Sequence, residues 1–218
     1  MRRRWVALLC VLTVAGLGYV VLFTSLLGVR SVEVHGARSV PGDQILAAAA
    51  VPTLKPMLLL DTGEIAARVT NIPGVATVEV SRSWPSTVDI TVTERSPIGF
   101  TAETDGFHLV DSGGLDYKTV QNKPDGLPEV QVATVSPQDA VTRSVVAVLA
   151  TVPEPLKGQI VVVRAKTPGG VEFALNTGKT VRWGDAENAD RKARVLTVLL
   201  TREGRTYDVA SPELPTVS

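Results

Sequence analysis

The longest hydrophobic stretch of the chain is a run of 25 residues without charge, Trp5 to Val29, which directly follows Arg2, Arg3 and Arg4. A helix of this length rises about 37 Å, which is enough to cross a hydrocarbon core of about 30 Å. The arginines favour a cytoplasmic N-terminus. The pattern predicts a short cytoplasmic tail (1–4), a single transmembrane helix (5–29) and an extracytoplasmic remainder at the cell membrane.

A cleaved signal peptide is the main alternative for this run. Signal peptides have an apolar stretch of about 7–15 residues that ends in a small-x-small cleavage site. The run here is longer, and its end, residues 24–28, offers no Ala-x-Ala site. The sequence therefore favours an anchor that is not cleaved.

Residues 30–95 contain three stretches in which apolar and polar residues alternate. Ser31–His35 is the first, and Gly36 ends it, as is typical of a short strand before a turn. In the second stretch Val78 and Val80 share one face. In the third stretch, Val88, Ile90 and Val92 share one face, and Thr and Asp residues lie on the other.

Two helices are predicted between the first and second of these strands. Residues 41–50 begin with a proline in the first turn, and residues 62–69 follow Asp61, which with Glu64 has the pattern of a capping box. The resulting order, β-α-α-β-β, predicts a small sheet with two helices on one face. Ser83 to Ser86 would form the hairpin between its last two strands.

The segment 30–95 resembles the POTRA module of the FtsQ/DivIB family of cell-division proteins. The family pattern runs roughly V-x-V-x-G, L-x-x-D, P-x-V and V-x-R-x-W/F-P-x-T, and ends in E-R-x-P. This chain supplies its residues in order: Val32, Val34, Gly36, Leu59, Asp61, Pro73, Val75, Val80, Arg82, Trp84, Pro85, Thr87, Ile90, Val92, Glu94, Arg95 and Pro97. So long an ordered match is specific.

Residues 96–218 read as short strands separated by turn residues, with two helices. Strands are predicted at 107–111, from 127 to 130, at 160–165, 171–175 and 179–183, and at 206–209. Ser136 would cap a helix that ends near Val152, and a second helix would run over 186–202. The order of HLVDSGG, LPEV, GKTVRWGD, KARVLTVLL and TYDVASPELP is similar to that of the FtsQ β-domain. The expected fold is α+β: the membrane helix, a POTRA domain (30–95) and a β-domain (96–218).

Composition and charge exclude several classes of function. Beyond the first arginines, 19 basic residues face 22 acidic ones and form no basic stripe, so nucleic acid is not expected as a partner. Cys10 lies in the predicted span, so no disulfide is expected outside. The motifs of penicillin-binding proteins, α/β-hydrolases, zinc proteases and P-loop proteins are missing. We expect no cofactor, no metal site, no small-molecule substrate and no enzymatic activity.

Residues that could form an acidic or metal-binding cluster have simpler explanations in the sequence. Asp105, Asp111, Asp116 and Asp125 border glycines or predicted turns, where such residues are favoured. The two histidines have no metal-ligand spacing with each other. These side chains are therefore expected to be structural or exposed.

The resemblance implies that the C-terminal strands of the β-domain bind a segment of FtsB, in a complex with FtsL, at the division septum. A strand with unpaired backbone groups can accept a strand from another protein. On this chain the residues in question are Tyr207, Val209, Ala210 and Leu214, with Trp183 and Arg191 as further candidates. Arg191, Lys192 and Arg194 would line the outward face of the last helix.

Each of these candidates has a second interpretation, in which it is structural or merely solvated and does not bind a partner. Tyr207 and Val209 could pack inward, Trp183 could be a core residue, and Arg191 could be only solvated. In the POTRA module, Arg82, Trp84 and Pro85 form a candidate recruitment surface in the hairpin, although Trp84 could also fill the space between sheet and helices.

The family resemblance predicts a non-enzymatic scaffold of the division machinery that helps to control septal peptidoglycan synthesis. A POTRA-bearing accessory of envelope protein transport or outer-membrane assembly is the alternative. Such proteins carry repeated modules and a β-barrel, and this sequence shows neither. An exported enzyme is a third possibility, for which no set of catalytic residues is present.

Overall fold

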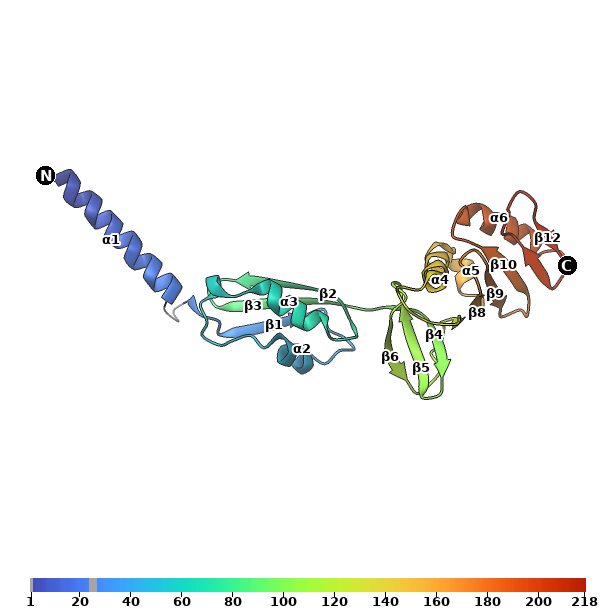
Figure 1. Cartoon of the computed structure of the whole chain (residues 1–218), viewed down its shortest axis with the longest axis horizontal. Coiled ribbons are helices and arrows are strands. Elements are labelled where there is room, and N and C mark those ends of the chain that lie inside the picture. Colours follow the sequence, from blue (N-terminus) through green and yellow to red (C-terminus); the bar gives the residue numbers. More distant parts are fainter. Residues whose placement is uncertain (1, 24–26) are drawn as a thin grey trace. The chain divides into compact units, whose positions relative to one another are not determined.

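The computed structural model describes residues 2–23 and 27–218. The chain divides into two compact units, of which the first includes helix α1 (Arg2–Phe23) and ends at Arg95, and the second begins at Ser96 (Figure 1). Within the described ranges, no helix combines the length and the apolar character that a membrane crossing requires. The predicted span over 5–29 is therefore not confirmed, and its residues 24–26 lie outside the described part.

The first unit has the predicted β-α-α-β-β order after α1. Strand β3 lies in the centre of its sheet, parallel to β1 and antiparallel to β2. A 3-10 turn, η2, precedes the second helix. The bounds are β1 (Ser31–His35), α2 (Gly42–Ala49), η2 (Met57–Leu59), α3 (Thr62–Thr70), β2 (Val75–Ser83) and β3 (Thr87–Glu94).

One face of this sheet forms the core of the unit with α2 and α3. The alternation of β3 places its valines and isoleucine on that face, where they are buried with Ile45 and Ile65 of the two helices. Asp61 caps α3 as predicted, because its Oδ1 accepts from the backbone N–H of Glu64 at 3.0 Å. Glu64 itself pairs with Arg68 at 2.7 Å.

The end of β3 is bound to the loop after β1 through one side chain, Glu94. Its carboxylate accepts from the backbone N–H groups of Arg38 (2.7 Å), Ser39 (2.8 Å) and Val40 (2.9 Å). Burial alone would raise the pKa of Glu94, but the hydrogen bonds from the Ser39 hydroxyl and the three N–H groups lower it to about 2. The family-pattern glutamate therefore has a structural role in this chain.

The second unit is built on one mixed sheet in the order β12-β11-β10-β9-β8-β7-β4-β5-β6. The two predicted helices and the six predicted strands are present, and the structure adds the strands β4, β6 and β12 and a one-turn helix, α5. The bounds are β4 (Pro97–Glu103), β5 (Gly106–Asp111), β6 (Asp116–Val120), β7 (Glu129–Gln131), α4 (Ala140–Thr151), α5 (Glu154–Lys157), β8 (Ile160–Ala165), β9 (Val171–Leu175), β10 (Thr180–Gly184), α6 (Ala189–Leu199), β11 (Thr206–Asp208) and β12 (Thr216–Val217).

The core of the second unit lies between strands β7 to β11 and the helices α4 and α6, which contact each other. Helix α4 begins later than predicted. Asp139, not Ser136, is its N-cap and accepts from the backbone N–H of Thr142 at 2.7 Å. The Ser136 hydroxyl instead accepts from the N–H of Gln138 at 3.2 Å, so it belongs to the preceding turn.

Candidate partner-binding surface

The far edge of the second sheet is closed by the chain itself, contrary to the expectation of a free β11. Strand β11 pairs in parallel with β10 on one side and antiparallel with β12 on the other. The Thr206 N–H donates to the Ser218 carbonyl at 2.8 Å, and the Ser218 N–H donates to the Thr206 carbonyl at 3.0 Å. A turn in which the Leu214 N–H donates to the Ser211 carbonyl at 3.0 Å brings the chain back, with Pro212 inside the turn and Pro215 directly after it.

Tyr207 and Val209 pack into the β-domain and do not face a partner, which is the structural role left open for them by the sequence. Both are fully buried, with 0% exposure. The Tyr207 hydroxyl lies 2.8 Å from the Arg202 carbonyl oxygen and 3.0 Å from that of Gly204. The Val209 N–H donates to the Arg182 carbonyl at 2.9 Å. Their side chains therefore support the edge of the sheet and are not exposed to a partner.

Trp183 is also a core residue. It is fully buried beside Phe173, with ring centroids 5.5 Å apart, and Lys192 Nζ lies 6.0 Å from its ring. Among the described residues, its Nε1 has no hydrogen-bond acceptor. A buried donor without an acceptor is destabilising, so Trp183 is held here by the packing of its ring.

Lys192 was expected on the outward face of the last helix, and the structure places it inside. Its side chain is 1% exposed, and Nζ donates to Asp185 Oδ1 at 2.7 Å and to the Asp185 carbonyl at 3.1 Å. The hydrogen bond from Lys192 lowers the pKa of Asp185. The long apolar stem fills core space while the ammonium group reaches the loop after β10.

Three of the predicted residues are exposed near the closed edge. Arg191 Nη1 forms an ion pair with Glu213 Oε1 at 2.7 Å, which joins α6 to the turn before β12. Ala210 is exposed, and Leu214 has 81% of its surface exposed. A single exposed leucine is common on protein surfaces, so these residues matter here only through their position next to the sheet edge.

In the first unit, the structure separates the roles of the three hairpin candidates. Arg82 donates through Nε to the Met57 carbonyl at 2.8 Å and through Nη2 to the Leu60 carbonyl at 2.6 Å. It therefore joins β2 to the η2 turn. Trp84 is 53% exposed and Pro85 is exposed, so Trp84 does not fill the space between sheet and helices.

One group of side chains in the described part of the chain could hold a metal ion. Glu33, His35 and Asp89 have ligand atoms within 4.8 Å of one another. They lie on the polar face of the first sheet, where Glu33 is directly opposite Asp89 in the parallel ladder. Spacing along the sequence did not reveal this group because the strand pairing, and not the local sequence, brings Asp89 to His35.

Comparison with known proteins places both units in one family. The FtsQ-type POTRA domain matches residues 27–95, and the C-terminal domain of the cell division proteins FtsQ/DivIB matches residues 101–211. The chain belongs to the FtsQ/DivIB family of cell division proteins. Its two units are accordingly the POTRA domain and the β-domain of that family.

Curated FtsQ proteins of actinobacteria are similar over most of the chain. Cell division protein FtsQ of Mycolicibacterium smegmatis is 39% identical over 98% of this chain and 63% of its own length. FtsQ of Mycobacteroides abscessus is 37% identical over 96% of this chain and 67% of its own length. The chain thus spans about two thirds of the length of these relatives.

A solved structure of a more distant member was also found. The major extracytoplasmic domain of the cell division protein DivIB from Geobacillus stearothermophilus is 18% identical, and the similarity covers 45% of this chain and 85% of that chain with a TM-score of 0.36. Membership in the FtsQ/DivIB family therefore depends on the sequence matches.

Proposed function

We propose that this chain is a non-enzymatic scaffold of the bacterial division machinery, which binds FtsB and FtsL by β-strand addition and helps to control septal peptidoglycan synthesis. The curated relatives are named cell division proteins, and both of their characteristic domains are present. The observation that carries the proposal is the short strand at the edge of the β-domain sheet. Thr216–Val217 is all of β12, and few hydrogen bonds hold it.

The hydrogen-bond pattern favours replacement of β12 over addition outside it. Backbone groups alternate between the two sides of a strand. Because Ser218 bonds to Thr206 of β11, Thr216 points to the same side and Val217 points outward. A partner strand outside β12 would therefore find the donor and acceptor of one residue. A strand in place of β12 would find the outward groups of Thr206 and Asp208, while the N–H of Ala210 beyond them donates to Asp208 Oδ1 at 3.0 Å.

The exposed residues around this edge are suited to a partner strand that replaces β12. Release of β12 and the preceding turn would separate Glu213 from Arg191 and free the guanidinium group for a carboxylate of the partner. Exposed ion pairs contribute little energy by themselves, so the backbone pairing supplies the affinity and Arg191 the orientation.

An anchoring role for the N-terminal segment belongs to the same proposal. The uncharged run from Trp5 to Val29 and the arginines before it support attachment to the cell membrane, with both compact units on the extracytoplasmic side. Membrane fractionation and protease accessibility of the two units in intact cells test this part. Recovery of the whole protein in the soluble fraction would contradict it.

The experiment that tests the function combines depletion with binding. Depletion of the protein should give filamentous or branched cells, and the purified chain should bind the extracytoplasmic segment of FtsB, with and without FtsL. The chain should leave isolated peptidoglycan unchanged. Normal division after depletion, or turnover of a cell-wall substrate, would contradict the proposal.

A further inference from the structure

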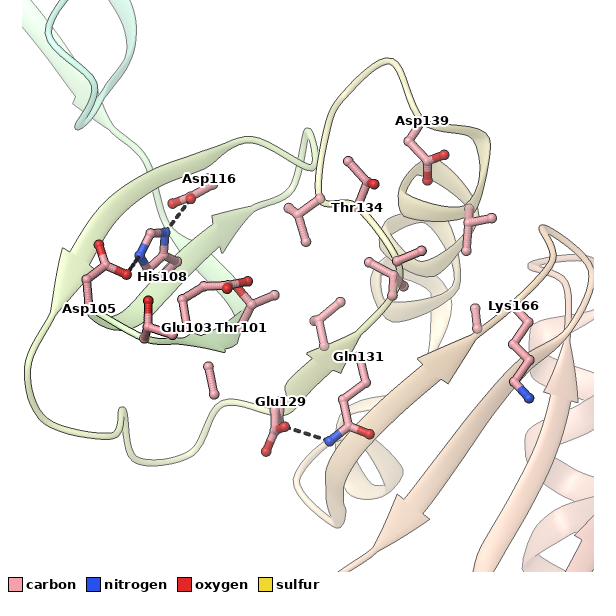
Figure 2. Close-up of a pocket in the computed structure, with 18 residues that line it drawn as sticks. Thr101, Glu103, Asp105, His108, Asp116, Glu129, Gln131, Thr134, Asp139 and Lys166 are labelled. Carbon is pink, nitrogen blue, oxygen red and sulfur yellow. Dashed lines mark hydrogen bonds and ion pairs between the residues drawn. The ribbon is translucent and has the colours of Figure 1, made fainter.

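The β-domain sheet has an opening between β4 and β7, and four strands separate β7 from β12. The two strands pair through one position, Phe100 opposite Glu129, where the Phe100 N–H donates to the Pro128 carbonyl at 3.1 Å. Beyond this pair β4 continues along β5 to Glu103, while β7 ends at Gln131. The strands diverge there, and a cleft of about 760 Å³ opens between them (Figure 2).

Glycine at position 99 allows β4 and β7 to approach closely next to this pair. A Cβ atom at Gly99 would lie 2.7 Å from Val130 Cγ2 and 3.0 Å from the Pro128 carbonyl oxygen. The close approach at this position therefore requires glycine. The sheet is joined at Gly99 and Phe100 and is open beyond them.

Backbone groups of both strands point into this cleft. Because the Phe100 N–H points to β7, alternation places the N–H and C=O of Ala102 on the same side. On the other wall the Pro128 carbonyl points to β4, so alternation directs the N–H of Val132, one residue past the end of β7, to the same side. Ala102 is exposed and Val132 is half-buried. Neither has a strand partner on the cleft side among residues 27–218.

The walls of the cleft carry an excess of negative charge. Glu103, Asp105 and Asp116 lie on the β4–β6 side, Glu129 and Asp139 lie on the other, and Lys166 is the basic residue of the lining besides His108 (Figure 2). His108 bridges Asp116 (2.6 Å) and Asp105 (2.9 Å). One positive lysine and one histidine face five carboxylates, so the cleft favours a cationic occupant.

We propose that this cleft binds an extended, lysine- or arginine-rich segment of another protein, which adds as a strand along β4. The open backbone groups of Ala102 and Val132 would bind the main chain of the segment, and the carboxylates, Glu103 and Glu129 foremost, its basic side chains. The site is separate from β12, from which β8 to β11 divide it. A partner can therefore occupy it while FtsB is bound.

The test uses the whole purified chain and a synthetic octapeptide of alternating lysine and valine, with binding followed by fluorescence anisotropy. Two matched peptides separate backbone pairing from charge: one replaces lysine by glutamate, and one carries N-methyl groups on alternate amides. The lysine–valine peptide should bind, and both matched peptides should bind at least about tenfold more weakly.

Variants of the chain locate the binding. Ala102→Pro removes the donor that faces the cleft and leaves the ladder with β5 in place, and Glu103→Gln with Glu129→Gln removes two charges. Each should weaken the peptide at least about tenfold, while Glu154→Gln on α5, an exposed carboxylate outside the cleft, should have no effect. Binding that Ala102→Pro leaves unchanged in a folded protein, equal binding of either matched peptide, or no binding at all would overturn the proposal.

Discussion

Val217 lies directly opposite Tyr207 in the antiparallel ladder between β12 and β11. The pairing covers the edge that a partner strand would otherwise use, and Tyr207 beneath it is fully buried. A charge or a proline at Tyr207 would therefore test folding as much as binding. Sharper probes act on the backbone donors of the residues next to this pair, Asp208 and Thr216.

The buried Lys192 should contribute to the stability of the β-domain. Lys192→Ala removes the hydrogen bonds to Asp185 and leaves a cavity under α6, so we expect the free energy of unfolding to fall by about 2–4 kcal/mol. Lys192→Met keeps the stem, and Asp185 is half-exposed and can be hydrated, so its effect should be about 1–2 kcal/mol. Urea unfolding followed by tryptophan fluorescence, with Trp5 and Trp84 replaced by Phe so that Trp183 alone reports, measures both values.

Arg194→Ala is the matched control for Lys192, because Arg194 is an exposed basic residue on the same helix. Its effect should be within about 0.5 kcal/mol. If Arg194→Ala and Lys192→Ala had equal effects, the buried position of Lys192 would be wrong.

Glu94 makes the stability of the POTRA domain depend on pH in a definite direction. Its pKa is lowered from 4.5 to about 2, so its stabilising contribution is fully present above about pH 4.5 and is lost as the pH falls toward 2. Glu94→Ala should lower the stability at pH 7 by about 1–3 kcal/mol and remove this part of the pH dependence.

Hydrogen exchange of the β1 and β3 amides, read by mass spectrometry in the whole chain, follows the POTRA domain by itself. Glu79→Ala, at an exposed glutamate of β2, is the control and should change protection little. An unchanged acid dependence in Glu94→Ala would show that the loop at Arg38–Val40 is held by other contacts.

The hairpin residues of the POTRA domain should separate stability from recruitment. Arg82→Ala removes two hydrogen bonds to carbonyls of the η2 region and should destabilise the domain by about 1–3 kcal/mol. Trp84→Ala removes a mostly exposed side chain and should change stability by less than about 1 kcal/mol. If Trp84 belongs to a recruitment surface, its variant should still fold and bind FtsB but should localise poorly to the septum, as fluorescence microscopy of tagged protein would show.

The elements that the sequence predicted correctly depend on local patterns. The alternation of Val88, Ile90 and Val92 was sufficient for β3, and the capping pair at Asp61 was sufficient for the start of α3. At Ser136 and Asp139, two possible N-caps compete three residues apart, and local sequence does not decide between them. The structure selects Asp139, which bonds to the N–H of Thr142.

The features that the sequence did not predict depend on contacts between distant segments. Strand β12 has two residues and follows two prolines, so it has no period to detect, and its partner β11 defines it. Lys192 was assigned to the outward face because of its charge, whereas the carboxylate of Asp185 is what allows it inside. Asp105 and Asp116 look like turn residues in the sequence, and only the pairing of β5 with β6 brings Asp116 to His108.

The most direct test of the account is the affinity of the extracytoplasmic FtsB segment for two proline variants, measured by isothermal titration calorimetry. Thr216→Pro removes the donor that β12 directs to β11 and weakens β12 as a competitor. Asp208→Pro removes the β11 donor that a replacing strand needs. The N–H groups of Tyr207 and Val209, which face β10, are unchanged, so β11 should stay paired with β10.

If a partner strand replaces β12, Thr216→Pro should bind FtsB up to about tenfold more tightly than the unmodified chain, and Asp208→Pro should bind at least about tenfold more weakly. Val217→Pro, compared with Val217→Ala, should lose nothing further, because its N–H points away from β11. Weaker binding by Thr216→Pro, or unchanged binding by Asp208→Pro in a folded protein, would contradict the account.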